Sequence, residues 1–285
     1  MLARRRTAAA EADDVRRLLV NEPRGHADMY GCFVVPPDDD GADLGVVFFH
    51  NEGYSTACGH GTIALVTWAV DERLVPVTEP ETRVVVDAPS GRLSTVARVS
   101  DGRVLSVSFT NVPCYVDRIV DLEGARAAIA FGGAFYVHVD ARDLGLEVEP
   151  SRLPELIAAG RRLKRAVEER WEVVHPLEPE LRGIYGVRFS QGERNVTVFA
   201  NGEVDRSPCG SSTCSHLAVL GLAPGERFRS VSLVGTEFAA RVVAADEVAG
   251  RPAIVPEVTG SAFRTGRHVF ELDPNDPLGT GFLLR

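Results

Sequence analysis

Alternating apolar and polar residues make up much of the chain and predict β-strands with one buried face. Between the strands stand Ser-Gly, Asp-Gly and Gln-Gly pairs, which favour the tight turns of antiparallel hairpins. Three such strands are predicted as a meander within 82–116. Further strands are predicted at 29–35, 44–50, 130–140, 184–190, 194–200, 228–234, 237–244, 252–258 and 268–273, and Pro252 and Pro256 weaken the prediction for 252–258.

Helical spacing of apolar residues replaces this alternation in a few stretches. Residues 151–170 predict a helix with a basic outer face, and an exposed tail leads into a first helix at 11–20. Two shorter helices are predicted at 61–72 and 211–221, each after a small-residue turn that contains a Cys-Gly pair. The order of strand, turn, Cys-Gly and helix therefore occurs twice, and this repeat predicts an α+β chain of two similar halves.

The amino-acid composition and net charge argue against some classes of binding partner. The 285 residues are 45% hydrophobic and 25% charged, an ordinary balance for a globular protein. A net charge of -9 argues against nucleic acid or an anionic membrane surface as a partner. No apolar run approaches the roughly 18 residues of a membrane span. Five scattered cysteines without a Cys-x-x-Cys pair, and a start that does not resemble a signal peptide, favour a reducing, cytoplasmic location.

The two Cys-Gly turns carry the most specific chemistry in the sequence. Cys58 lies in "STACGHGTIALV" and Cys209 in "DRSPCGSSTCSHLAVL", each at the predicted start of a helix. Free backbone amides at a helix N-terminus lower the pKa of a thiol and can bind a carboxylate. A lone cysteine of this kind is more often a buried packing residue. Two in matched positions favour a pair of reactive thiols.

Other residues near these turns have alternative interpretations. Cys58 with His60, and Cys209 with Cys214 and His216, supply zinc-ligand types, but their spacing fits no usual zinc pattern, so no metal site is predicted. Asp205 is either an ordinary turn residue or an anchor for a substrate ammonium group. His60 could bind the same nitrogen or cap the turn, and the spacing does not decide between these roles.

Several segments resemble the proline racemase family, which includes 4-hydroxyproline epimerases. They are "EPRGHADMYG", "NEGYSTACGHGTIA", "NVTVFANGEVDRSPCG", "VTGSAFRTG" and "DPLGTGFLLR", and the similarity runs from about Asp13 to the C-terminus. The resemblance implies two pseudo-symmetric halves, each a curled, mostly antiparallel sheet around a central helix, with the active site in the cleft between them. We expect residues 1–140 to form the half carrying Cys58, completed by a C-terminal strand within 268–285, and 141–267 to form the half carrying Cys209.

The resemblance also implies a mechanism without a cofactor. Cys58 and Cys209 would face opposite sides of the substrate α-carbon, one removing a proton as thiolate and the other delivering one as thiol. Asp205 and His60 would hold the ring nitrogen of a small imino acid, the one partner predicted apart from a homodimer, for which the sequence gives no sign either way. The remaining implied substrate contacts are the amides of Gly59, His60, Gly210 and Ser211 at the carboxylate and the aromatic rings of Tyr30 and Phe199 at the substrate ring.

Two thiols favour a racemase or epimerase that inverts the α-carbon of 4-hydroxyproline or proline. The first alternative is a trans-3-hydroxyproline dehydratase, although such relatives usually carry Thr or Ser where this chain has Cys58. The second is an inactive, N-terminally truncated paralogue that only binds imino acids, because the chain lacks the first strands usual in the family. Two further departures are Ser212, which replaces a glycine and would be strained at positive φ, and a second helix that ends early, at Gly221.

Overall fold

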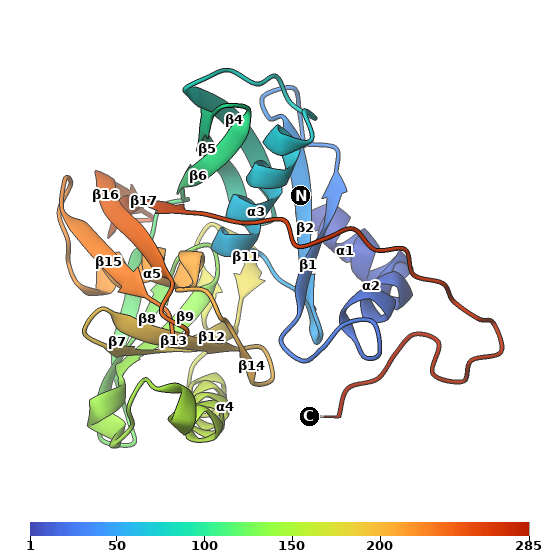
Figure 1. Ribbon diagram of the computed structural model, residues 1–285. Coiled ribbons are helices and arrows are strands. Elements are labelled where there is room, and N and C mark those ends of the chain that lie inside the picture. Colours follow the sequence, from blue (N-terminus) through green and yellow to red (C-terminus); the bar gives the residue numbers. More distant parts are fainter. Residues whose placement is uncertain (285) are drawn as a thin grey trace.

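One large, curled β-sheet forms the body of the molecule, and the computed structural model describes residues 1–284 (Figure 1). The fold is mixed α+β, as the sequence predicts. A separate hairpin pairs β10 (Val174–His175) with β11 (Glu178–Arg182). The 15 strands of the main sheet are, in spatial order, β1 (Tyr30–Val35), β2 (Leu44–His50), β4 (Glu81–Ala88), β5 (Gly91–Ser100), β6 (Arg103–Thr110), β17 (Arg251–Gly260), β16 (Glu237–Val248), β15 (Arg227–Val231), β13 (Arg194–Phe199), β12 (Ile184–Gln191), β9 (Phe135–Asp140), β8 (Ala125–Phe131) and β7 (Tyr115–Leu122), with β3 (Gly53–Tyr54) beside β2 and β14 (Glu203–Val204) beside β13.

The strand pairing around α3 (Gly59–Asp71) recurs around α5 (Gly210–Val219). In the first copy β1 and β2 are antiparallel, β2 and β4 are parallel across the helix, and β5 and β6 follow as antiparallel neighbours. In the second copy β12, β13, β15, β16 and β17 repeat that pattern. Strands β6 and β17 pair with each other and join the two copies. The division into halves at residue 140 stays a prediction, and β9 pairs with β12 across it.

Burial explains why α3 is apolar on most of its faces. Ile63, Leu65 and Val66 pack into one cluster with strands β2, β4, β5 and β6, and Leu217 of α5 joins the same cluster. A second cluster lies under α4 (Leu153–Arg170), an amphipathic helix whose basic side faces outward. No helix in the part of the chain that the structure describes is long and apolar enough to cross a membrane.

The helices α3 and α5 meet at their N-termini through a contact between two glycines. A Cβ atom on Gly59 would lie 2.5 Å from Cα of Gly210, and a Cβ on Gly210 would lie 2.6 Å from Cα of Gly59. Real Cβ atoms do not approach backbone so closely, so only glycine fits at either position. This contact brings the first turns of the two helices against each other.

The N-terminal segment differs from the sequence prediction. The first ten residues, predicted as an exposed tail, form α1 (Leu2–Glu11), which is followed by α2 (Asp13–Val20). Arginine and alanine have high helix propensity, and side chains of α1 find partners on the body. Arg4 pairs with Asp38, and Arg5 donates to the carbonyl of Tyr54.

The predicted strand at 268–273 is wrong. Among the described residues of 261–284 no strand forms, and the segment runs from β17 across α3 and past α1 and α2 (Figure 1). Side-chain contacts, and not the backbone hydrogen bonds of a strand, hold this segment against the body of the protein. Glu72 pairs with Arg264 and Arg267, and Arg24 donates to carbonyls of the segment. Within residues 261–284, no C-terminal strand completes the sheet of the first copy, and the pairing there is limited to a bridge between Glu22 and Phe282.

Smaller differences concern breaks and prolines. The strand predicted at 130–140 is two strands, β8 and β9, because the chain turns at Gly133, which has a φ of +96°. Strand β7 was not predicted as a separate element. Pro252 and Pro256 are tolerated because β17 forms its ladder with β6 only from Glu257 onward. Helix α5 ends at Val219, close to the predicted end, and Gly221 follows with a φ of +69°.

Replacing Gly210 with alanine tests the contact between the helices. The added methyl group would meet the backbone of Gly59, and overpacking of this kind costs about 1–3 kcal/mol or more. We expect Gly210→Ala to lower the free energy of unfolding by at least about 2 kcal/mol in urea denaturation. Gly266→Ala is the matched control because its Cβ would meet only the side chain of His268. Equal stability of the two variants would contradict the close contact.

Candidate active site

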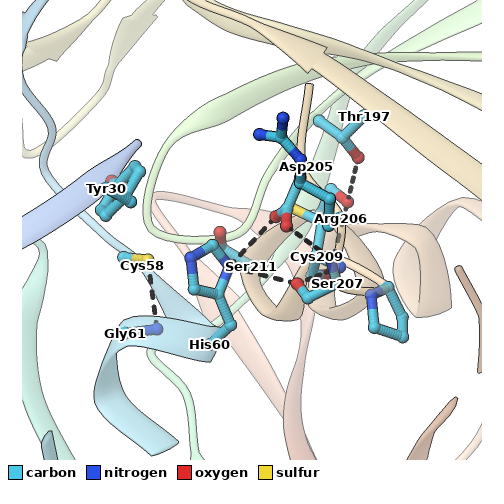
Figure 2. Close-up of polar contacts among 12 residues, drawn as sticks. Tyr30, Cys58, His60, Gly61, Thr197, Asp205, Arg206, Ser207, Cys209 and Ser211 are labelled. Atoms are coloured by element: carbon cyan, nitrogen blue, oxygen red, sulfur yellow. Dashed lines mark hydrogen bonds and ion pairs between the residues drawn. The ribbon is translucent and has the colours of Figure 1, made fainter. Parts of the chain in front are cut away.

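The two cysteines occupy equivalent positions but have different surroundings. Each is the N-cap residue of its helix, Cys58 for α3 and Cys209 for α5, and each is buried. Cys58 is extended, and its Sγ accepts a hydrogen bond from the amide of Gly61 at 3.2 Å (Figure 2). Cys209 has a φ of +57°, a conformation that non-glycine residues rarely adopt, and its side chain makes no capping bond.

The pKa of Cys209 is raised, contrary to the expectation from its helix position. Burial raises it to about 11, and the charge of Asp205 acts in the same direction. Desolvation of the thiolate therefore outweighs the helix N-terminus in the free protein. Cys209 is a thiol at neutral pH.

His60 and Asp205 form an ion pair beside the cysteines. His60 Nδ1 lies 3.1 Å from Asp205 Oδ2 and 3.1 Å from the Oγ of Ser207, as Figure 2 shows. Burial opposes both charges, but Asp205 and Cys58 hold the pKa of His60 well above its ordinary value. Burial likewise opposes the Asp205 charge, yet the interaction with His60 keeps its pKa below the ordinary value. The His60–Asp205 pair is therefore charged at neutral pH. The residue that caps helix α3 is Cys58 and not His60.

The four predicted amide donors lie in the first turns of the facing helices. Gly59 and His60 begin α3, and Gly210 and Ser211 begin α5. Amides at these positions precede the first intrahelical hydrogen bonds, which start at the amides of residues 62 and 213. The two helices therefore present a group of amide donors on both sides of their contact.

Aromatic rings line the other side of the site. The ring of Tyr30 lies 5.3 Å from that of His60 and 5.9 Å from that of Phe199. Sequence reasoning missed Tyr185, which stacks on Phe199, and His50, which contacts Tyr30 and Phe199. Burial lowers the pKa of His50 to about 3, so it is neutral. Nothing in the sequence sets these two residues apart from inward-facing residues of ordinary strands.

A cavity of about 700 Å³ opens at this group of residues. Its lining includes Tyr30, His60, Phe199 and Asp205, together with Phe238 of β16 and Phe263 of the C-terminal segment. The cavity wall therefore brings together four of the predicted residues from distant segments, whereas Cys58 and Cys209 are buried and are not part of its lining. Most of the cavity wall is apolar, which suits a small ring that carries a few polar groups.

Cys114, Cys214 and Ser212 are buried outside this cavity. Cys214 packs in the apolar cluster with Cys114, whereas His216 stacks on His138. Within residues 1–284 no group of three His, Cys, Asp or Glu side chains is placed to hold a metal ion. The expected strain at Ser212 is absent because the residue is helical, and its hydroxyl lies 3.0 Å from that of Thr197.

The fold and the paired cysteine-capped helices define a class of α+β proteins with one site between two helix N-termini. The sequence profile of the family described as Proline racemase matches residues 1–283, and the chain belongs to that family. A solved hydroxyproline epimerase from Agrobacterium vitis, with bound trans-4-OH-L-proline, has a TM-score of 0.90 and 35% identity. That match covers 96% of this chain and 83% of the other.

Sequence relatives carry two kinds of name. A trans-3-hydroxy-L-proline dehydratase from Bacillus thuringiensis subsp. konkukian (strain 97-27) is 43% identical, and the match covers 99% of this chain and 90% of that protein. A 3-hydroxyproline 2-epimerase from Burkholderia multivorans (strain ATCC 17616 / 249) is also 43% identical, over 100% of this chain and 90% of that protein. Both share the family, and their names differ in the reaction.

Replacing Asp205 tests the ion pair. Without the carboxylate, burial becomes the main influence on His60, so we expect its pKa to fall in Asp205→Asn. Histidine ring NMR signals followed against pH measure the change. Ser207→Ala removes the neighbouring hydroxyl but keeps the carboxylate, and there the pKa of His60 stays above its ordinary 6.5. An unchanged pKa in Asp205→Asn would show that the pair does not hold the proton.

Proposed function

We propose that the protein is a cofactor-independent hydroxyproline 2-epimerase in which Cys58 and Cys209 exchange the α-proton. The observation that carries the proposal is the pair of cysteines at the facing N-termini of α3 and α5. Inversion of a carbon centre needs a base on one face and an acid on the other. Two thiols on opposite helices meet this requirement, and the names of the epimerase relatives support it.

The environments of the two thiols assign their starting roles. Cys58 accepts a hydrogen bond from the amide of Gly61, whereas burial raises the pKa of Cys209 and keeps it a thiol, so we assign Cys209 as the starting acid and Cys58 as the starting base. In this state Cys58 takes the α-proton and Cys209 gives its proton to the opposite face. The α-carbon then carries the inverted configuration, Cys58 holds a proton and Cys209 is the thiolate. The reverse reaction starts from that second state.

The negative charge formed on the substrate needs stabilisation by the protein. Loss of the α-proton moves charge into the substrate carboxylate, and amides of Gly59, His60, Gly210 and Ser211 are the donors that would receive it. Asp205, with His60 beside it, would bind the ring nitrogen. Tyr30 and Phe199 would contact the ring, and the substrate is a 3- or 4-hydroxyproline or proline.

The second candidate is dehydration of trans-3-hydroxy-L-proline, which the name of a 43% identical relative favours. Both reactions begin with removal of the α-proton. Dehydration then expels the 3-hydroxyl group and yields a cyclic imine, so it needs only one thiol as base. The presence of Cys58 and Cys209 together favours inversion. A protein that only binds imino acids would keep the pocket but would not exchange the proton.

The proposal also concerns the cellular location and the oligomeric state of the protein. Thiols that act as acid and base must stay reduced, which suits the cytoplasm. Two halves, each with one cysteine, and a homodimer both remain consistent with the proposal. Neither a metal nor a cofactor has a step in it.

Proton NMR in D₂O with reductant tests the reaction. The protein is mixed separately with trans-4-hydroxy-L-proline, trans-3-hydroxy-L-proline and L-proline. We expect the α-proton signal of at least one compound to disappear while its 2-epimer appears. Formation of a cyclic imine from the 3-hydroxy compound would establish the dehydratase instead. Absence of α-proton exchange with all three compounds would support a protein that only binds imino acids.

Cysteine variants assign the thiols. General acid–base groups contribute about 10²–10⁴-fold, so Cys58→Ser and Cys209→Ser should each lower kcat/KM for inversion by at least about 10²-fold. Cys32→Ser is the control because Cys32 lies on β1 near the site, and burial raises its pKa to about 12, which keeps it inert. A Cys58→Ser variant with normal inversion would remove the two-thiol mechanism.

A further inference from the structure

A buried arginine with no carboxylate partner lies behind the helix that carries Cys209. Arg188 of β12 is fully buried, and none of the ion pairs among residues 1–284 includes it. Its guanidinium donates only to neutral oxygens. These are Ser190 Oγ at 3.2 Å from Nε, the Pro208 carbonyl at 3.3 Å, Ser212 Oγ at 3.2 Å and Thr213 Oγ1 at 3.2 Å from Nη1, and Ser230 Oγ at 3.1 Å from Nη2.

Burial without an anion makes this charge costly. It lowers the pKa of Arg188 to about 10, and the charge of Asp205, together with that of Cys209 whenever this thiol is ionised, acts in the opposite direction. Arg188 is still a cation at neutral pH. The buried His138 and His216 nearby have pKa values well below the ordinary one, through burial and the Arg188 charge, and are neutral. Asp205 is already paired with His60, so the remaining anion available to Arg188 is the thiolate of Cys209.

The same guanidinium holds the turn that sets the position of Cys209. It bonds the carbonyl of Pro208, the residue directly before the cysteine, and Thr213 Oγ1 donates to the same carbonyl at 3.0 Å. Cys209 has a positive φ, which persists only where neighbouring contacts fix it. Ser212 belongs to this set of hydroxyl groups.

We propose that Arg188 is a positioning residue that holds the Cys209 turn and stabilises the thiolate that Cys209 becomes when it gives its proton to the substrate. The inference deepens the proposed function and rests on it. In the resting state Arg188 lacks an anion. When Cys209 gives its proton to substrate, the thiolate left behind supplies one, and reprotonation removes it again.

Alkylation of Cys209 by iodoacetamide tests the inference without any turnover. The rate at Cys209 is measured from pH 6 to 10 by peptide mass spectrometry in wild type, Arg188→Met, Arg188→Gln and Arg188→Lys. Only thiolate reacts. We expect the two uncharged variants to alkylate about tenfold more slowly at pH 8, with the profile displaced to higher pH by about one unit. Arg188→Lys gives an intermediate profile, because a buried lysine loses its charge at lower pH than arginine.

The controls separate charge from fold. Arg194→Met removes an exposed arginine at the start of β13 and should leave the Cys209 profile unchanged. The other titratable groups that interact with Cys209, namely Asp205, His60, Tyr136 and Tyr185, are present in every variant. A merely structural role for Arg188 would lower thermal stability without moving the pH profile.

Identical Cys209 profiles in wild type and a folded uncharged variant would overturn the inference. If neither uncharged variant folds, Arg188→Lys decides above the pH at which the buried lysine loses its charge: a Cys209 profile that is not displaced there overturns the inference, and a displaced one supports it. The wild-type epimerase assay is a separate measurement. If the protein exchanges no α-proton but the pH profile of Cys209 alkylation depends on Arg188, the proposed function is contradicted. If the protein is an active epimerase but the pH profile is the same with and without Arg188, only the role of Arg188 is contradicted.

Discussion

The contact between Gly59 and Gly210 is the constraint on which the rest of the site depends. Neither residue has room for a Cβ atom, so the N-termini of α3 and α5 lie as close as two backbones can pack. The cysteine that precedes each glycine is thereby held at the same junction. Pairing of β6 with β17 joins the two repeated strand arrangements that carry these helices. A small change at this junction would alter the positions of both thiols at once.

Electrostatics distinguishes two residues of the same chemical type. The Sγ of Cys58 accepts a hydrogen bond from the amide of Gly61, whereas burial and the nearby Asp205 raise the pKa of Cys209. Enzymes commonly assign acid and base roles in this way, by placing like groups in unlike environments. The His60–Asp205 pair adds no net charge, and the unpaired Arg188 supplies a positive one behind α5.

Much of the site could be predicted from the sequence because its chemistry lies in short, local patterns. The Cys-Gly turns, Asp205 and His60 could be singled out because of their residue types and their positions near the predicted start of a helix. Tyr185 and His50 did not, because an aromatic residue that points inward from a strand looks the same whether it lines a core or a pocket. Arg188 was also hidden, since an arginine within a strand ordinarily faces solvent.

Fold prediction failed where tertiary contacts override local pattern. The stretch at 268–273 alternates like a strand, yet arginine side chains and Glu72 hold the described part of the C-terminal segment without a ladder. The alanine- and arginine-rich N-terminal segment was predicted to be an exposed tail, but Arg4 pairs with Asp38 and Arg5 donates to the carbonyl of Tyr54. The raised pKa of Cys209 has the same origin, because burial cannot be read from a helix-capping position alone.

The source of the α-hydrogen in the product at early conversion tests the central claim of two opposed thiols most directly. With an active substrate in D₂O, one thiol removes the proton while the other, already exchanged with solvent, delivers deuterium. The account predicts that the first-formed 2-epimer carries deuterium at the α-carbon, while the unconverted substrate keeps its proton. A product that retains the original proton would mean that one group serves both faces and would contradict the two-thiol mechanism.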